Sequence, residues 1–166
     1  RIFFNINNNN NFTNKDLLDT AQIAIKRNIS LKKVIDNDKW FFKCYSSNIR
    51  LIIVGAVHIA EPLVNIAETI GYKTIVIDPR DNFDEKRFKN VQKILRKWPD
   101  EGLKEIEIDN KCAVVTLTHD PKLDDPALNY ALHSNAFYIG CLGSKKTHES
   151  RIKRLQKRKF SDKDLT

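Results

Sequence analysis

Apolar residues from position 51 onward come in short runs that alternate with longer amphipathic stretches. The clearest runs are rich in β-branched or aromatic residues and end at Gly, Pro, Asp or His. They are LIIVG at 51–55, KTIVID at 73–78, AVVTLT at 113–118 and AFYIGCLG at 136–143. Short continuous runs of this kind are typical of strands that are buried on both faces of a sheet.

Helix-length amphipathic stretches fill the intervals at residues 59–70, 84–97 and 124–133, and one more at 144–159 follows the last run. The segment KEIEID, residues 104–109, predicts one further short strand. Regular alternation of strands and helices favours a parallel sheet with right-handed crossovers and helices on both faces. The predicted fold class is therefore α/β, a Rossmann-like doubly wound parallel sheet.

The first 44 residues have a different pattern. Asparagine dominates residues 5–14, which have almost nothing to bury and are expected to form a loop or a poorly ordered segment. Thr13 or Asn14 is a candidate cap for a short helix that ends near Asn28. The segment WFFKCYSSNIR then reads as a strand and a connection into the main domain.

We therefore expect two parts. Residues 1–44 would be the partly disordered, Asn-rich tail of an upstream domain or a linker, and residues 45–166 would be the Rossmann-like domain. Because the chain begins with Arg1 and stops at Thr166 without a closing element, we expect a piece of a longer protein whose domain is truncated at its C-terminal end.

Composition restricts the setting. The 166 residues are 41% hydrophobic, which suits one domain with a real core. No apolar run approaches the roughly 20 residues that span a bilayer, and no signal peptide is recognisable, so we expect a cytoplasmic protein without a membrane partner. Cys44, Cys112 and Cys141 show no CxxC spacing, so a disulfide or a zinc site is not expected, and the apolar surroundings of Cys112 and Cys141 favour buried thiols.

The formal net charge is +8, and most of it lies near the C-terminus. Between Ser144 and Lys159 there are eight basic residues against Glu149 alone. The segment lacks interleaved aromatic residues, so nucleic-acid binding is not expected. A solvated outer face, or a docking surface for an acidic protein, fits better.

The first strand-to-helix turn has the pattern of a dinucleotide-binding fingerprint with one departure. Residues 55–60, GAVHIA, match G-x-G-x-x-G/A except that Val57 replaces the second glycine, which normally lets the backbone approach a pyrophosphate. Asp78, followed by Arg80, stands where the fingerprint places a ribose-binding acid. The turn that begins at Gly55 is thus a strong fold marker but weaker evidence for NAD(P) binding.

The last strand-to-helix turn is a candidate anion site. Gly140 and Gly143 free the backbone, Ser144 can cap the following helix, and Lys145 and Lys146 lie beside its positive end. Backbone N–H groups, a hydroxyl and two ammonium groups suit a phosphate or a pterin phosphate. An ordinary capped helix with a solvated basic face explains the same residues.

A third group follows the third run, where Thr118, His119 and Asp120 should emerge at the same sheet edge as His58. A histidine and a carboxylate there can titrate near neutral pH or donate hydrogen bonds to a ligand. The plainer interpretation is that Asp120 or Asp124 caps the next helix. No spacing supports a metal site, and no catalytic motif is recognisable, so catalytic residues stay unassigned.

These motifs, taken together and in this order, resemble the C-terminal Rossmann domain of the XdhC/CoxI family. The segments that carry the resemblance are RLIIVGAVHIAEPLVNIAETIGYKTIVIDPR, WPDE, AVVTLTHDPKLDDPALNYAL and AFYIGCLGSKKTHESRIKRL. THDPKLDDPAL and GCLGSKKTH are more specific than the glycine pattern. The family turn usually reads G-A-G-H, so Val57 departs from it while His58 remains.

The resemblance implies an accessory factor for xanthine dehydrogenase and related molybdenum hydroxylases rather than an enzyme. Such a factor binds molybdenum cofactor (molybdopterin), assists its sulfuration and inserts it into the apo-hydroxylase, with a cysteine desulfurase and a homodimer as further expected partners. The phosphate would lie near residues 140–146 and 55–58, and His119, Asp120 or Asp78 would contact the pterin. Two alternatives stay open: an NAD(P)-dependent oxidoreductase domain, and a docking module without any small-molecule ligand.

Overall fold

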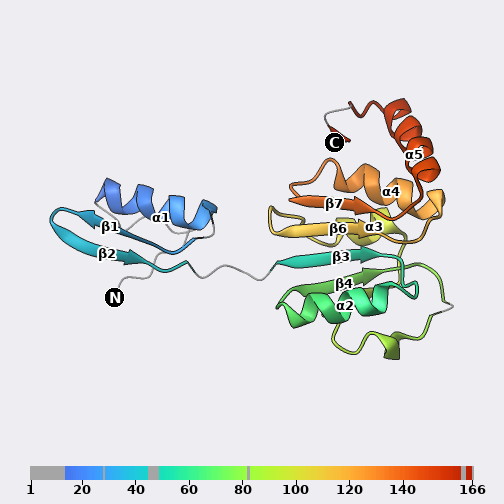
Figure 1. The fold of residues 1–166 in the computed structure, drawn as a ribbon, viewed down its shortest axis with the longest axis horizontal. Helices are drawn as coiled ribbons and strands as arrows, with labels where there is room; N and C mark the ends of the chain where they lie inside the picture. The colour runs from blue at the N-terminus through green and yellow to red at the C-terminus, as the bar shows by residue number, and fades with distance from the viewer. Residues whose placement is uncertain (1–13, 28, 45–48, 82, 162–163, 166) are drawn as a thin grey trace. The chain divides into compact units, whose positions relative to one another are not determined.

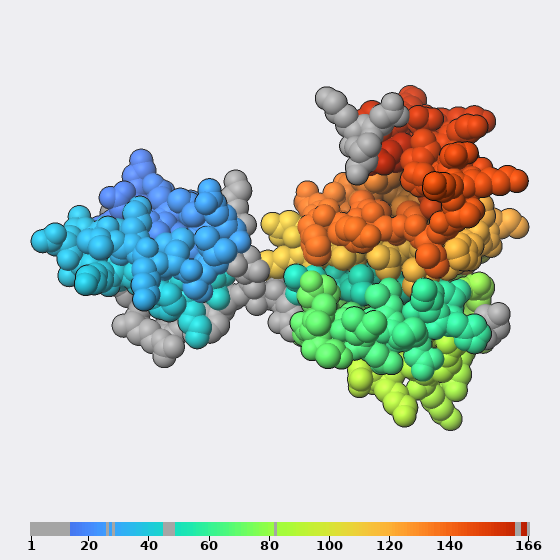
Figure 2. Space-filling view, viewed as in Figure 1, coloured from blue at the N-terminus to red at the C-terminus, as the bar shows by residue number. Residues whose placement is uncertain are grey.

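The computed structural model describes residues 14–27, 29–44, 49–81, 83–161 and 164–165. They belong to two compact units, Arg1–Ser47 and Asn48–Thr166 (Figures 1 and 2). The prediction for residues 5–13 lies outside the described residues. In the part of the chain that the structure describes, no helix is long and apolar enough to cross a membrane.

The first unit is a helix packed on a two-stranded hairpin. Helix α1 (Lys15–Arg27) follows Asn14, whose Oδ1 accepts hydrogen bonds from the N–H groups of Asp16 at 3.0 Å and Leu17 at 3.2 Å. The predicted Asn14 cap is therefore confirmed.

The hairpin that follows α1 was not predicted. Strands β1 (Leu31–Ile35) and β2 (Asp38–Phe42) are antiparallel, and Asp36 and Asn37 between them have φ values of 53° and 69°. Two adjacent residues with positive φ are what a tight hairpin turn requires. The strand expected near Trp40 thus exists, but it pairs with β1 inside the first unit.

The second unit is built on a five-stranded parallel sheet in the order β5-β4-β3-β6-β7. Its strands are β3 (Arg50–Val54), β4 (Lys73–Ile77), β5 (Lys93–Leu95), β6 (Cys112–Thr116) and β7 (Tyr138–Cys141). The first strand of the unit is central, the next two extend to one side and the last two to the other. The predicted doubly wound α/β fold is confirmed, and the direction of winding changes between β3 and β6 (Figure 1).

Successive side chains of each strand enter opposite cores. On one face Leu51 and Ile53 of β3 pack with Ala60 and Val64 of α2 (Ala60–Thr69). On the other face Ile52 and Val54 pack with Leu103 of α3 (Pro99–Lys104) and Ala127 of α4 (Pro121–Ala131). The last helix, α5 (Lys145–Lys157), packs on α4 through Leu128 and Leu155.

Two predicted elements are wrong. Residues 84–97 do not form a helix but contain a 3₁₀ turn, η1 (Glu85–Arg87), and then β5. Phe83 and Phe88 fold onto the α2 face of the sheet, with ring centroids 6.1 Å apart, which holds this segment against the core in a non-helical path.

The strand expected at residues 104–109 is also absent. Pro99 begins the short helix α3 in this region, and Gly102 packs so closely on Ile77 that an added Cβ would lie 2.8 Å from the Ile77 Cγ2. Ile106, which lies in an irregular segment after α3, packs in the same core as Ile77. The third strand of the winding is instead the three-residue β5.

Candidate functional site

The turns after β3 and β6 meet where the winding of the sheet changes direction. Gly55 in the first turn has φ of +112°, and a Cβ added to it would lie 2.6 Å from Cγ2 of Thr118 in the turn after β6. Only glycine allows this backbone conformation and this approach together. Ligands of doubly wound sheets bind at such a point, outside the carboxyl ends of the strands.

The first turn keeps some of its backbone donors for the protein itself. The N–H of Gly55 donates to the Ile77 carbonyl at 2.8 Å, and the N–H of Ala56 donates to Oδ2 of Asp78 at 2.7 Å. The N-cap residue of α2, Ile59, makes no side-chain capping hydrogen bond. The side chain of Val57 is partly buried against the core on the α2 face, so it does not simply project over the turn.

Asp78 is buried and held by the chain around it. Its carboxylate accepts from the N–H of Arg80 at 3.0 Å, from Nε at 2.9 Å and from Nη2 at 2.6 Å. Burial by itself would raise the pKa of Asp78, but hydrogen bonds from Arg80 and Ala56 outweigh it and leave the pKa below its ordinary value. Both carboxylate oxygens are therefore already occupied by donors of the protein.

Arg80 connects its ion pair with Asp78 to the turn between β6 and α4, which we call the third turn. The hydrogen bond to Asp78 is the main reason that the pKa of Arg80 is raised, and the charge of Asp120 raises it further. Asp120 belongs to the turn between β6 and α4, so the end of β4 and that turn share one electrostatic environment.

The third turn is tied down by its own side chains. Thr118 Oγ1 donates to Oδ1 of Asp124 at 2.6 Å and accepts from the N–H of Asp120 at 3.1 Å. Asp120 caps α4 by accepting from the N–H of Lys122 at 2.9 Å, as the plainer interpretation expected. Between Thr118 and Asp120, His119 is exposed and has φ of +61°, a left-handed conformation that is uncommon for a side-chain-bearing residue.

The last turn caps α5 and exposes two lysines. Ser144 accepts from the N–H of Thr147 at 3.2 Å, which confirms its predicted capping role, and Lys145 and Lys146 are exposed in the first helical turn. Gly140 allows the ring of Tyr138 to lie across it, since an added Cβ would come within 2.8 Å of that ring. The expected anion donors are thus on the surface at the positive end of a helix.

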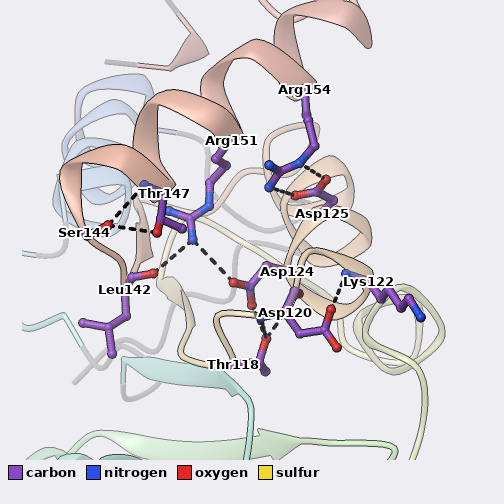
Figure 3. Close-up of polar contacts among 10 residues, drawn as sticks. All are labelled: Thr118, Asp120, Lys122, Asp124, Asp125, Leu142, Ser144, Thr147, Arg151 and Arg154. Atoms are coloured by element: carbon purple, nitrogen blue, oxygen red, sulfur yellow. Dashed lines mark hydrogen bonds and ion pairs between the residues drawn. The ribbon is translucent and has the colours of Figure 1, made fainter.

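Two ion pairs between α4 and α5, drawn in Figure 3, were not predicted as part of the site. Arg151 is 3% exposed and its Nη2 donates to the Leu142 carbonyl at 3.0 Å and to Oδ2 of Asp124 at 3.4 Å. Arg154 donates from Nε to Oδ2 of Asp125 at 2.6 Å and from Nη2 to Oδ1 at 3.0 Å. Arg151 therefore connects the last turn to the third turn, because Asp124 also holds Thr118.

The sequence contained one signal for these pairs. Two adjacent acids lie on one predicted helix, and two arginines lie three residues apart on the next. Sequence alone does not show which charges on two helices face each other. The same holds for the contacts of His58, whose Nδ1 lies 3.4 Å from Nη2 of Arg87, while Arg87 Nε donates to Glu61 at 3.0 Å.

The described residues include no group of three or more His, Cys, Asp or Glu side chains that could hold a metal ion. Cys112 and Cys141 are free thiols. Burial raises the pKa of Cys112 and of Cys141, which makes both less reactive as nucleophiles at neutral pH. The turns at Gly55, Thr118 and Ser144 offer hydrogen-bonding groups and charge at the strand ends.

Comparisons with known proteins identify the second unit. The XdhC Rossmann domain family matches residues 51–166. A probable xanthine dehydrogenase subunit of Bacillus subtilis (strain 168) is 33% identical over 107 residues, which are 64% of this chain and 31% of that protein. The molybdenum cofactor insertion chaperone PaoD of Escherichia coli (strain K12) is 37% identical over 60 residues, 36% of this chain and 19% of that protein.

A solved structure agrees with the sequence matches. The crystal structure of a xanthine dehydrogenase from Bacillus halodurans superposes with a TM-score of 0.62 at 29% identity, covering 73% of this chain and 37% of that one. The chain thus spans between 19% and 37% of the length of these relatives. The resemblance seen in the sequence is confirmed.

Proposed function

Because the chain belongs to the XdhC Rossmann domain family, we propose that it is part of an accessory factor that matures a molybdenum hydroxylase such as xanthine dehydrogenase. In this role it binds molybdenum cofactor, assists its sulfuration and inserts it into the apo-hydroxylase in the cytoplasm. The relatives named as a xanthine dehydrogenase subunit and as a molybdenum cofactor insertion chaperone support this proposal. The observation that carries it is the convergence of the Gly55 and Thr118 turns at the ligand-binding edge of the sheet.

The residues at this edge suit a ligand with a phosphate at one end. Lys145 and Lys146 are exposed and lie at the positive end of α5, and the N-terminus of α2 lacks a side-chain cap at Ile59. Helix N-termini favour negative charge because their first N–H groups have no partner within the helix. In our proposal these groups bind the phosphate of molybdopterin.

The polar groups of the third turn suit the pterin end. His119 and Asp120 are exposed beside Thr118 and can offer a donor and an acceptor to a heterocycle. Asp78 and Arg80 satisfy each other, so we assign them to holding the first turn through Ala56 rather than to direct contact. The cofactor supplies the molybdenum and its sulfur; the residues of this chain bind it, orient it and limit its exposure to water.

The oxidoreductase alternative needs a free ribose-binding acid. In dinucleotide-binding domains the acid at the end of the second strand accepts hydrogen bonds from ribose hydroxyls. Here both oxygens of Asp78 accept from Arg80 and Ala56, and no observation favours NAD(P) over the molybdenum cofactor. A cysteine desulfurase, a homodimer and the assignment of residues 1–44 to an upstream domain or linker stay predictions.

Cofactor retention tests the proposal. The protein is incubated anaerobically with molybdenum cofactor released from a molybdoenzyme and passed through gel filtration, and pterin and molybdenum are measured in the protein peak. We expect co-elution near one cofactor per chain and a marked loss in the double variant Lys145→Ala, Lys146→Ala. A folded wild-type protein that elutes without pterin would contradict the proposal.

A matched control separates the site from general charge. Lys32 and Lys39 are exposed and lie on the hairpin of the first unit, so Lys32→Ala with Lys39→Ala removes the same charge elsewhere. We expect this control to retain cofactor as the wild type does. Equal loss in both double variants would show that net charge, and not the α5 turn, determines retention.

A further inference from the structure

The basic residues of α5 divide into two sets with different surroundings. Arg151 and Arg154 face α4, where Asp124 and Asp125 neutralise them. The lysines of the helix are exposed, and within the described ranges no ion pair involves Lys146, Lys153 or Lys157. The positive charge that reaches solvent is therefore the part that α4 leaves unpaired.

The exposed lysines form a row. Lys146, Ser150, Lys153 and Lys157 are related by steps of four, three and four residues, which places them on one side of a helix. The row extends about 16 Å along α5, because each residue rises about 1.5 Å. We call this surface the lysine row. Glu149 is the only acidic residue of α5.

The lysine row is unfavourable for the helix in isolation. Lys153 and Lys157 are four residues apart, where like charges repel. Lys146 lies in the first turn, where the helix dipole favours negative rather than positive charge. An anionic partner would relieve both repulsions, whereas water and salt only screen them.

The position of the row connects it to the site. Lys146 lies in the first turn of α5, next to the connection that follows β7 at the carboxyl edge of the sheet, and the row leads from there along the outer side of α5. Figure 2 shows the orange-red α5 segment at the surface of the second unit. A protein bound along the row would have one end beside the turns at Thr118 and Ser144.

We propose that the lysine row docks an acidic surface of the protein that receives the cofactor, and this inference rests on the proposed function. Charge complementarity selects an acidic partner. Phe, Tyr and Trp, on which bases stack best, are absent from α5 (Lys145–Lys157), so we choose a protein rather than a single-stranded nucleic acid as the occupant. Docking along Lys153 and Lys157 places the recipient next to the N-terminus of α5, where Lys145 and Lys146 bind the phosphate in our proposal.

The test uses charge reversal away from the cofactor turns. The variant Lys153→Glu, Lys157→Glu keeps Lys145 and Lys146, and Lys32→Glu with Lys39→Glu is the matched control in the first unit. Each protein is measured against an immobilised xanthine dehydrogenase freed of its cofactor, over a series of salt concentrations. We expect association to slow about tenfold in the row variant at low salt and the difference to shrink at about 0.5 M salt.

The outcomes separate the two proposals. Row and control variants that associate equally fast would overturn the docking surface while leaving cofactor retention intact. A wild-type protein that retains cofactor but does not bind the apo-enzyme would overturn docking and the insertion step, and leave cofactor binding standing. If the wild type bound a short RNA as well as it binds the apo-enzyme, and the row variant lost that RNA binding, the choice of a protein partner would be overturned.

A second variant guards against unfolding. Lys153→Gln with Lys157→Gln removes the charges without adding new repulsion, and helical circular dichroism with cofactor retention reports whether α5 still packs on α4. An intermediate association rate for this folded variant would support the lysine row. A rate equal to that of the wild type would count against it.

Discussion

Gly55, the first residue of the turn after β3, lies so close to Thr118 in the turn after β6 that it has no room for a side chain. An added Cβ would lie 2.6 Å from Thr118 Cγ2 and 3.3 Å from its backbone nitrogen, and φ at Gly55 is +112°. We expect Gly55→Ala to lower the free energy of unfolding by more than about 2 kcal/mol, because strain and contact add. Urea unfolding measures this loss.

Gly71 provides the comparison for that variant. It also has a positive φ, +83°, but an added Cβ would meet nothing within 4 Å. Gly71→Ala should therefore show only the backbone penalty, about 1 kcal/mol. If both alanine variants lose the same stability, the contact with Thr118 has no energetic weight.

The buried pair of Asp124 and Arg151 should be costly to break. Both side chains are at most 4% exposed, and removal of one partner leaves the other charge without compensation in the core. We expect Asp124→Ala to lower the unfolding free energy by about 3 kcal/mol or more. Asp120→Ala removes only an exposed helix cap and should lose about 1 kcal/mol; a reversal of this order would contradict the structure.

Stability should depend on pH through Asp78. Its pKa is lowered in the folded protein from an ordinary value of 3.8, so the folded state favours the ionised form. This contribution is fully present above about pH 5 and is lost as the pH falls through the folded-state pKa. We expect Asp78→Asn to be less stable than the wild type at pH 7 and the difference to narrow below about pH 4.

Asp81 is the control for that series. It pairs with Arg96, but its side chain is 96% exposed, so Asp81→Asn should leave the unfolding free energy nearly unchanged at each pH. Urea midpoints recorded at several pH values for the three proteins provide the test. A constant difference between wild type and Asp78→Asn across this range would show that Asp78 is not the titrating group.

NADH binding should be absent in the wild type, because Arg80 and Ala56 occupy the oxygens of Asp78. We expect no change in NADH fluorescence up to about millimolar concentration, the range where binding is worth about 4 kcal/mol. Micromolar binding that is lost in Asp78→Asn would instead support a dinucleotide site and the oxidoreductase alternative.

The sequence predicted the parts of the fold that depend on local pattern. The four long strands, the helices α2, α4 and α5 and the cap at Ser144 could be recognised because each has its own periodicity or capping residue. Strand β5 has three residues, too few to show a period of two, and Phe88, Val91 and Ile94 imitate a helical spacing while they pack on the sheet.

Only the location of the candidate site could be predicted from the sequence. Parallel strands end at one edge, so the meeting of the Gly55 and Thr118 turns followed from the fold class. The partners of Asp78 and Asp124 did not follow, because each contact joins elements whose relative rotation is decided by packing. The contacts of Val57 did not follow either: its side chain lies partly buried against the core on the α2 face.

Strands β3 and β6 pair at the centre of the sheet, beginning at Arg50 and Cys112, although they are far apart along the chain. Strands β3, β4 and β5 can associate through neighbouring segments, but β6 must close a long loop before it reaches β3, and contacts of that kind form slowly. We therefore expect the edge where the two halves meet to form late in folding. A ligand bound there would stabilise the completed sheet relative to any state in which β3 and β6 are not yet paired.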